Sequence, residues 1–239
     1  MISTLNQIKK WMLLPSLLLF LFSCRKDRDN SPVIEKDINV TGFARIHAGE
    51  SFNLIITKGV NFSVKVKGPT NTVNDIDWNV ANNSLDIQYI HDRSNRSAVD
   101  ITITLPTLVQ LSLSGAGTAT ISGFGGQPNV IRTVLSGASK CTLNGAGVNT
   151  QIEISGASEL NVNGATESLY GNISGAAKLN AYDLISTEVD ISASGGSEAK
   201  VKVTDRLFIE ATGGSHVYYK GTPPVKNIQT SGGGQVTQQ

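Results

Sequence analysis

The amino-acid sequence predicts an all-β protein, a right-handed parallel β-helix or solenoid whose coils contain about 19 residues. The first observation behind this prediction is a short motif, Ser or Thr followed by Gly, that recurs seven times at spacings of 22, 19, 19, 20, 18 and 19 residues. The copies are Ser114–Gly117, Ser136–Ser139, Ser155–Ser158, Ser174–Ala177, Ser194–Ser197, Thr212–Ser215 and Ser231–Gly234. A fixed period of this kind is the signature of stacked repeats.

The second observation is that apolar and polar residues alternate on both sides of each copy. Leu111, Ser112 and Leu113 show this before the first copy, and after it the alternation resumes. One apolar column, two positions beyond the motif, contains Ala119, Cys141, Leu160, Leu179, Ala199, Val217 and Val236. Period-two alternation indicates strands with one buried face. Such strands bury that face only by stacking, so we expect each strand to pair in register with its equivalent one coil on.

The predicted corners of each coil depend on glycine. The Gly of the motif permits backbone conformations that other residues resist, and the pairs Asn144-Gly145 and Asn163-Gly164 indicate a second corner. A right-handed path is expected because parallel crossover connections are almost always right-handed.

The region before the repeats is less regular. Short alternating runs begin near Phe52, Phe62, Ser84 and Val99 and are separated by turn residues. We interpret residues 38–110 as irregular β opening coils or a β cap, and residues 111–239 as the regular repeats. The two parts together form a single predicted β-solenoid domain, 38–239.

The first 37 residues predict export and anchoring. Residues 1–23 have the basic start and short apolar run of a secretory signal peptide, and their end, Leu-Phe-Ser before Cys24, resembles a bacterial lipobox. That resemblance implies that Cys24 is lipidated, which would anchor the protein to a membrane. Residues 24–37 are predicted to be a solvated tether. Arg25 favours the outer membrane, at its periplasmic face or at the cell surface. The alternative is an ordinary signal peptide followed by an incidental cysteine.

Composition narrows the classes of partner. Without the signal peptide, which holds Lys9 and Lys10, 18 of the 20 basic residues remain against 19 acidic ones. This near balance argues against nucleic acid as a partner, which favours a strongly basic face. With Cys24 lipidated, Cys141 has no partner for an internal disulfide, and its position in an apolar column predicts that it is buried. No cofactor is predicted.

The repeated Ser-Gly-Ala-Ser, the Asn-Gly pairs and the lead-in Leu105-Pro106-Thr107-Leu108 resemble the head GIN domain family of putative auto-transporter adhesins, over about residues 38 to 235. The resemblance implies a right-handed β-helix, common among lipoproteins of Bacteroidetes-type bacteria, with an adhesive role. It supplies no catalytic residues. We therefore expect a non-catalytic adhesion or interaction module that recognises a protein or a glycan. The alternative is a carbohydrate-active enzyme or glycan-binding protein of the cell envelope.

The outward columns hold the side chains that could form a catalytic or metal site. One ordered charge array contains Lys140, Glu159, Lys178, Glu198 and His216. Its signs alternate, which favours ion pairs that set the register over a catalytic or metal site. His47, His91 and His216 show no metal-ligand spacing, so no metal site is predicted. Neither a catalytic residue nor an enzyme activity is predicted.

Three outward aromatic residues, Tyr170, Phe208 and Tyr218, are the candidate ligand contacts. Their alternative role is to shield the core near its end. The last coil has polar residues at inward positions, including Lys226, Thr230 and Gln238. We therefore expect this coil either to fray or to be completed by self-association with another chain.

Overall fold

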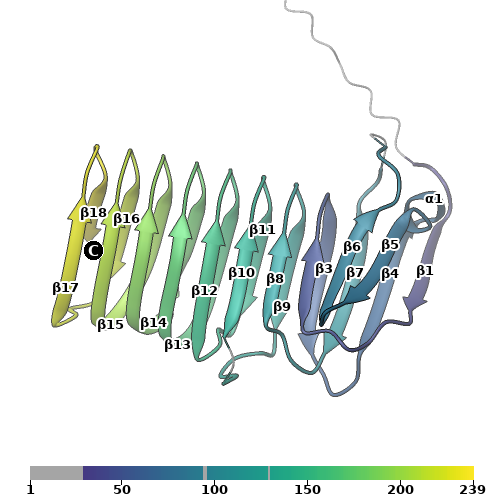
Figure 1. Cartoon of the computed structure of the whole chain (residues 1–239), viewed down its shortest axis with the longest axis horizontal. Coiled ribbons are helices and arrows are strands. Elements are labelled where there is room, and N and C mark those ends of the chain that lie inside the picture. The colour runs from purple at the N-terminus through teal and green to yellow at the C-terminus, as the bar shows by residue number, and fades with distance from the viewer. Residues whose placement is uncertain (1–28, 94–95, 129) are drawn as a thin grey trace, which may run out of the picture.

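The structure is a computed structural model that describes residues 29–93, 96–128 and 130–239. The predicted signal peptide and Cys24 lie outside the described residues. The described chain is an elongated stack of β coils with one short helix near its N-terminal end (Figure 1). No helix among the described residues has the length and apolar character needed to cross a membrane. The all-β solenoid is confirmed, and its handedness stays a prediction.

The elements fall into an opening part and a repeating part. The opening part contains β1 (Val33–Ile38), β2 (Arg45–Ala48), β3 (Phe52–Lys58), β4 (Ser63–Pro69), α1 (Thr70–Val73), β5 (Ile76–Ala81), β6 (Ser84–Tyr89) and β7 (Val99–Leu105). The repeating part contains β8 (Gln110–Leu113), β9 (Thr118–Ser122), β10 (Ile131–Leu135), β11 (Lys140–Asn144), β12 (Asn149–Ile154), β13 (Glu159–Ile173), β14 (Lys178–Ala193), β15 (Glu198–Ala211), β16 (His216–Lys220), β17 (Val225–Thr230) and β18 (Gln235–Gln238).

Each repeating coil has two sides, which form two rows of parallel strands along the stack. The leading row consists of the strands that precede the motif, such as β8, β10 and β12, and the trailing row consists of those that follow it, such as β9 and β11. From β8 onward each strand pairs with its equivalent one coil on, as predicted. The column that begins at Ala119 stays in register through every coil to Val236.

The motif forms the corner between the two rows. Its glycine has a positive φ in all seven copies, from 62° at Gly232 to 75° at Gly115 and Gly137. The corners also stack tightly, since a Cβ built on Gly156 would lie 2.4 Å from the carbonyl oxygen of Gly137. The predicted second corner is confirmed by positive φ angles of 87° at Gly145 and 112° at Gly164.

The core is a narrow strip between the rows and contains the predicted apolar columns. It also contains a feature that we did not predict, a column of buried serines at the last position of the motif. Ser139 donates to Ser158 across 3.2 Å, and Ser215 donates to the carbonyl of Ala193 at 3.1 Å. Buried hydroxyls need such partners. The backbone of the preceding coil supplies a carbonyl to Ser139, Ser197 and Ser215, and Ser158 has the hydroxyl of Ser139.

The opening part departs from a simple stack. β2 and β3 precede β6 and β7 in the chain, yet they lie between the coil of β6 and β7 and the coil of β8 and β9 (Figure 1). The in-register pairing expected for the repeats therefore does not extend to the strands before β8, which the sequence predicts to be irregular. The outer end is closed by antiparallel strands, with β4 against β7, β1 against β4, and β5 against β6.

The segment expected to be a tether is partly built into this end. Residues 33–38 form β1 instead of a solvated linker, and the backbone before them is held too. Asp29 accepts hydrogen bonds from the Thr72 amide at 3.0 Å and the Thr72 hydroxyl at 2.7 Å, and Pro32 accepts one from the Thr70 hydroxyl at 2.7 Å. We call this contact of Asp29–Pro32 with α1 the N-terminal clamp. It arises because α1 has unpaired amide groups at its start.

The last coil is formed, with β17 paired to β15 and β18 paired to β16. Every residue of β17 is exposed, and Lys226, Thr230 and Gln238 stand opposite Leu207, Ala211 and Tyr219 of the preceding coil. The polar substitution of the inward columns is therefore as the sequence indicates, and self-association through this coil stays a prediction.

Candidate functional site

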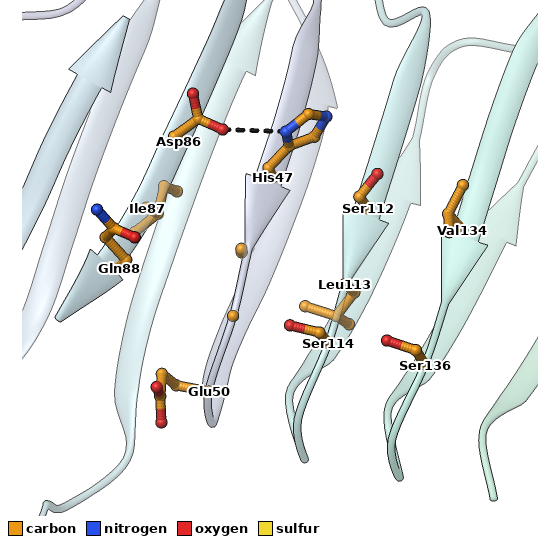
Figure 2. A pocket seen from close by; sticks show the side chains of 12 residues that line it. His47, Glu50, Asp86, Ile87, Gln88, Ser112, Leu113, Ser114, Val134 and Ser136 are labelled. Atoms are coloured by element: carbon orange, nitrogen blue, oxygen red, sulfur yellow. Dashed lines mark ion pairs between the residues drawn. The ribbon is translucent and has the colours of Figure 1, made fainter. Parts of the chain in front are cut away.

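A groove of about 410 Å³ lies on the leading row, across β6, β2, β8 and β10. Figure 2 shows its polar side chains along four neighbouring strands. They are His47, Glu50, Asp86, Gln88, Ser112, Ser114 and Ser136. β2 ends at Ala48, and Gly49, which follows it, has no side chain; a Cβ built on Gly49 would lie 3.5 Å from the Ser114 hydroxyl.

The corner beside this groove is a variant of the repeated motif. Glu50 takes the left-handed conformation, with φ of 64°, that glycine takes in the other corners. Its carbonyl accepts the amide of Ala116 at 2.9 Å, so it stacks on the next corner as a motif residue would. A sequence of Ala-Gly-Glu-Ser at residues 48–51 lacks the Ser-Gly signature. The coil was therefore missed by repeat counting, and with it the groove.

The polar groups of the groove are linked in a chain. His47 Nδ1 lies 3.0 Å from a carboxylate oxygen of Asp86, and His47 Nε2 lies 3.5 Å from the Gln110 amide nitrogen. The same Gln110 nitrogen donates to the Ser112 hydroxyl at 2.8 Å. The Gln110 amide therefore lies between the imidazole of His47 and the Ser112 hydroxyl.

This geometry does not activate a nucleophile. In a Ser-His-Asp triad the serine hydroxyl donates to the imidazole, which then removes its proton. Here the Ser112 hydroxyl accepts from an amide, and the only described partner of His47 Nε2 is that same amide. The arrangement presents hydrogen-bonding groups on a fixed surface, as a binding site does. His47 and Asp86 are each about two-fifths exposed, at 43% and 38%.

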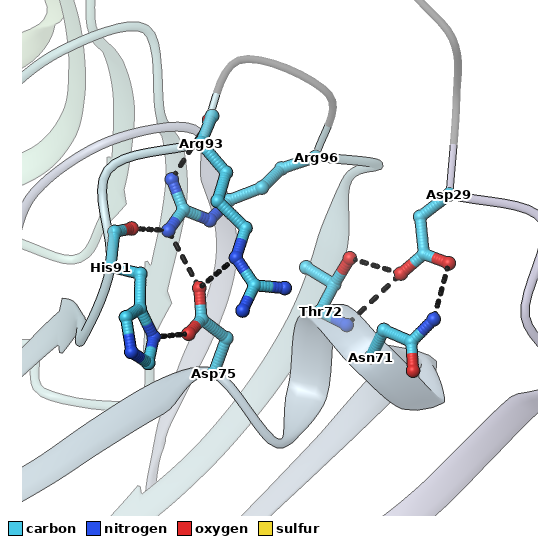
Figure 3. A network of polar contacts seen from close by, with 7 residues as sticks. All are labelled: Asp29, Asn71, Thr72, Asp75, His91, Arg93 and Arg96. Carbon is cyan, nitrogen blue, oxygen red and sulfur yellow. Dashed lines mark hydrogen bonds and ion pairs between the residues drawn. The ribbon is translucent and has the colours of Figure 1, made fainter.

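A second polar cluster closes the outer end of the solenoid (Figure 3). Asp75 has a side chain only 4% exposed and lies 2.5 Å from His91 Nδ1 and 2.7 Å from Arg96, with Arg93 at 3.9 Å. Burial raises the pKa of Asp75, but the hydrogen bonds from His91 and Arg96 and the charge of Arg93 outweigh it, so the pKa lies below its usual value. The Arg96 guanidinium also lies 3.7 Å from the centre of the Tyr89 ring.

Next to this cluster lies the N-terminal clamp, and a small cavity of about 80 Å³ separates the two. The Thr72 hydroxyl and the Ser31 amide hydrogen-bond to Asp29 and lower its pKa to about 2. Asp29 therefore stays ionised, and the clamp intact, until the pH falls well below 4. Each described partner of Asp75 and Asp29 belongs to the cap, so we interpret both clusters as structural.

The structure separates the three candidate ligand contacts. Tyr170 and Phe208 share one outward column of the leading row, but Asp190 lies between them. Tyr218 lies in the trailing row, opposite Lys200. Tyr170 is 38% exposed, whereas Phe208 and Tyr218 are half-buried. The three rings therefore do not form one aromatic patch, because the corner motif places residues before and after it on different sides of the coil.

The charge array has the predicted register, with Lys140, Glu159, Lys178, Glu198 and His216 as successive neighbours. Its ion pairs are only partly between coils. Lys140 lies 3.8 Å from Glu159, whereas Glu198 pairs at 2.6 Å with Lys200 of its own strand. Within the part of the chain that the structure describes, no three His, Cys, Asp or Glu side chains could hold a metal ion.

Known proteins share a sequence pattern and a fold with this chain. The sequence pattern described as "Putative auto-transporter adhesin, head GIN domain" matches residues 42–223. A crystal structure of a putative adhesin from Bacteroides fragilis is similar with a TM-score of 0.76 and 21% identity, over 88% of this chain and 99% of that one. A putative adhesin and a putative lipid binding protein from Parabacteroides distasonis, each 16% identical, reach TM-scores of 0.69 and 0.65 over 88% of this chain and 98% of theirs. No curated protein matches the chain.

Proposed function

The chain belongs to the head GIN domain family of putative auto-transporter adhesins, and on this premise we propose that it is a non-catalytic adhesion module anchored in the cell envelope. The module recognises a protein or glycan on another surface. The solenoid is the rigid scaffold, and its outward side chains make the contacts.

The observation that carries this proposal is the groove of Figure 2. Four neighbouring coils present hydroxyl, amide, carboxylate and imidazole groups to solvent, and these are the groups that recognise polar ligands. The imidazole of His47 is paired with Asp86 and separated from Ser112 by Gln110. A carbohydrate-active enzyme uses two carboxyl groups that flank the bond to be cleaved. Two carboxyl groups, Glu50 and Asp86, line the groove, but Asp86 is already paired with His47, which favours binding over that alternative.

The anchor is a lipid on Cys24, proposed from the lipobox-like sequence. The N-terminal clamp begins at Asp29, five residues after Cys24. Because an extended residue spans at most about 3.6 Å, the lipid would hold the capped end of the solenoid within roughly 18 Å of the membrane. The stack of coils would then extend from an end that is fixed near the outer membrane.

Adhesion is tested with cells that display the full chain, on panels of purified glycans, matrix proteins and bacterial surfaces. Ser112→Trp fills the groove, and Ser192→Trp is the matched control because it occupies the same outward column of the leading row. We expect Ser112→Trp to reduce adhesion at least tenfold and Ser192→Trp to leave it unchanged. Equal adhesion of the two variants, or a cleavage product from any glycan, would contradict the proposal.

Anchoring is tested separately by the intact mass of the protein purified from membranes. A diacylated or triacylated N-terminus at Cys24 is the expected result. In Cys24→Ser this mass should be absent, and the protein should leave the membrane fraction. An unmodified terminus elsewhere in the wild type would overturn the lipid anchor while leaving the adhesive function open to its own test.

A further inference from the structure

On the trailing row, away from the groove, strand β14 carries a bulge. Asn161 pairs with Asn180 and Asn163 with Asp183, so β14 contains one more residue than β13 over this stretch. On its other edge, Ala181 pairs with Val201 and Ile185 pairs with Lys202, which leaves residues 182–184 without partners on β15. Bulges re-aim side chains and are frequent beside functional sites. This one turns Tyr182 and Asp183 toward a pocket of about 240 Å³.

The floor of this pocket is a ladder of asparagine side chains. Asn180 donates to Asn161 Oδ1 at 2.9 Å, and Asn163 donates to Asn144 Oδ1 at 2.8 Å. These bonds between coils fix the orientation of each amide. The side-chain nitrogen of Asn180 also donates to Glu159 at 3.3 Å. The side-chain oxygen of Asn180 has no described donor, so it is left as an acceptor for a ligand.

The aromatic wall is Tyr182, which is held in place from two sides. Its hydroxyl donates to Gln239 Oε1 at 2.7 Å, and the Lys220 ammonium lies 4.2 Å from the centre of its ring. Lys220 does not line the pocket, so a ligand there would meet the ring away from the ammonium. The face of an aromatic ring carries partial negative charge and attracts polarised C–H groups.

Charged groups complete the rim. The Asp183 carboxylate is exposed and has no described hydrogen-bond or ion-pair partner, and Lys200 lies beside it in the next coil with Glu198 as its counter-ion. The Asp183 carboxylate can accept hydrogen bonds, and the Lys200 ammonium, whose charge is balanced by Glu198, can donate them. Such a pair suits a ligand that has several hydroxyl groups and no net charge. The volume lies below the roughly 300–1,000 Å³ of sites that enclose drug-sized molecules, which indicates a single ring.

We propose that this pocket, lined by Asn161, Asn163, Asn180, Tyr182, Asp183 and Lys200, binds one neutral pyranose ring at the end of a glycan. The ring stacks its C–H face on Tyr182, while its hydroxyls donate to Asp183 and Asn180 and accept from Lys200. The inference rests on the proposed adhesive function, for which it names the ligand class, and it adds a site distinct from the groove of the leading row.

The test is isothermal titration of the full chain, purified in detergent, with the methyl glycosides of mannose, galactose, glucose and N-acetylglucosamine. Glucuronic acid and an uncharged tripeptide are titrated as the competing ligand classes. We expect at least one neutral glycoside to bind. Tyr182→Ala and Asp183→Asn should each lower its association constant at least tenfold.

The matched controls are Ile185→Ala, an exposed apolar side chain of β14 that does not line the pocket, and Asp205→Asn, an exposed carboxylate outside the pocket. Both should bind as the wild type does, and thermal unfolding verifies that all four variants are folded. The proposal is overturned if no neutral glycoside binds, if only glucuronic acid or the tripeptide binds, or if the pocket variants bind normally. Binding of a glycoside without adhesion would refute the adhesive function alone, and adhesion without binding of any neutral glycoside would refute this site alone.

Discussion

Cys141 shows how burial determines the chemistry of a single residue in this solenoid. Its side chain is 1% exposed and lies between Ala119 and Leu160 in the trailing row. Burial raises the pKa of the thiol to about 12. Folding therefore favours the protonated thiol. The contribution of this thiol to the free energy of unfolding is fully present below about pH 9 and is lost as the pH rises toward 12.

We therefore predict that native Cys141 reacts with a thiol reagent far more slowly than the unfolded chain does. Cys141→Lys should reduce the free energy of unfolding by about 3 kcal/mol or more, because it places a charge without a partner in an apolar column. Cys141→Ala is the control and should cost only about 1 kcal/mol. Labelling kinetics and urea unfolding measure the two effects, and rapid labelling of the folded protein would contradict the burial.

Asp75 is the opposite case, a buried charge that the fold retains because two guanidinium groups, Arg93 and Arg96, and the imidazole of His91 surround it. Removing one partner of a buried ion pair leaves the other charges unpaired. We predict that Asp75→Asn lowers the free energy of unfolding by about 3 kcal/mol. Asp77→Asn, at an exposed position of β5, should change it by less than about 0.5 kcal/mol.

The pH dependence of Asp75 gives an independent check by urea unfolding. The lowered pKa of Asp75 means that its contribution is present above about pH 4 and is lost as the pH falls through the folded value. The wild type should therefore lose stability below pH 4 more steeply than Asp75→Asn does. Parallel stability curves for the two proteins would show that the carboxylate contributes nothing.

Among the structural elements, the charge array tests whether ion pairs hold the coils together. Glu159 accepts from the amides of Asn161 at 3.4 Å and Asn180 at 3.3 Å as well as facing Lys140. A glutamine keeps an acceptor for both amides and removes only a partly exposed ion pair. We predict that Glu159→Gln lowers the free energy of unfolding by less than about 1 kcal/mol, and that 1 M salt reduces the difference further. A loss above 2 kcal/mol would contradict this.

The corner element depends on glycine at one position of the motif and not at the next. Gly195 has φ of 71°, and a Cβ there would lie 2.9 Å from the Gly175 carbonyl oxygen. At Gly196 the nearest contact of a Cβ would be an ordinary 3.8 Å, and earlier coils have alanine at that position. The left-handed backbone of the corner and the close approach of the preceding corner together explain the invariant second residue of the motif.

We predict that Gly195→Ala destabilises the protein by about 1–2 kcal/mol from the left-handed conformation alone, with a further loss from the contact with the carbonyl. Gly196→Ala should be neutral or stabilising by up to about 1 kcal/mol, because alanine restricts the unfolded chain. Thermal and urea unfolding of the two variants provide the measurement. Equal losses would mean that the corner does not distinguish the two positions.

For the whole molecule, the position of β3 between β7 and β9 sets the order of the opening coils. Thr57 of β3 lies beside Thr104 of β7, with their hydroxyls 3.2 Å apart, and beside Ser122 of β9. Neighbouring strands are about 4.8 Å apart, which suits a disulfide. Thr104 and Ser122 are separated by β3 and should lie about twice that distance apart, which is too far.

We predict that the double variant Thr57→Cys with Thr104→Cys forms a disulfide on mild oxidation, and that Thr104→Cys with Ser122→Cys does not. Mass spectrometry of peptides under non-reducing conditions detects the link. If the coils stacked in chain order, the second pair would be adjacent and would cross-link instead. That result would overturn the arrangement of the opening part.

The sequence by itself determined the repeating half of this protein. Each strand there pairs with a near copy of itself, so the period, the alternation and the corner glycines are visible in one dimension. The tertiary structure alone decided the opening part, the groove and the bulge pocket. Ala48–Ser51 lacks the motif and pairs with strands about 40 and 65 residues away. Tyr182 gains its position only because its neighbours on both sides lack the extra residue. Contacts between dissimilar segments leave no periodic pattern, and they depend on which surfaces remain to be covered once the regular coils have stacked.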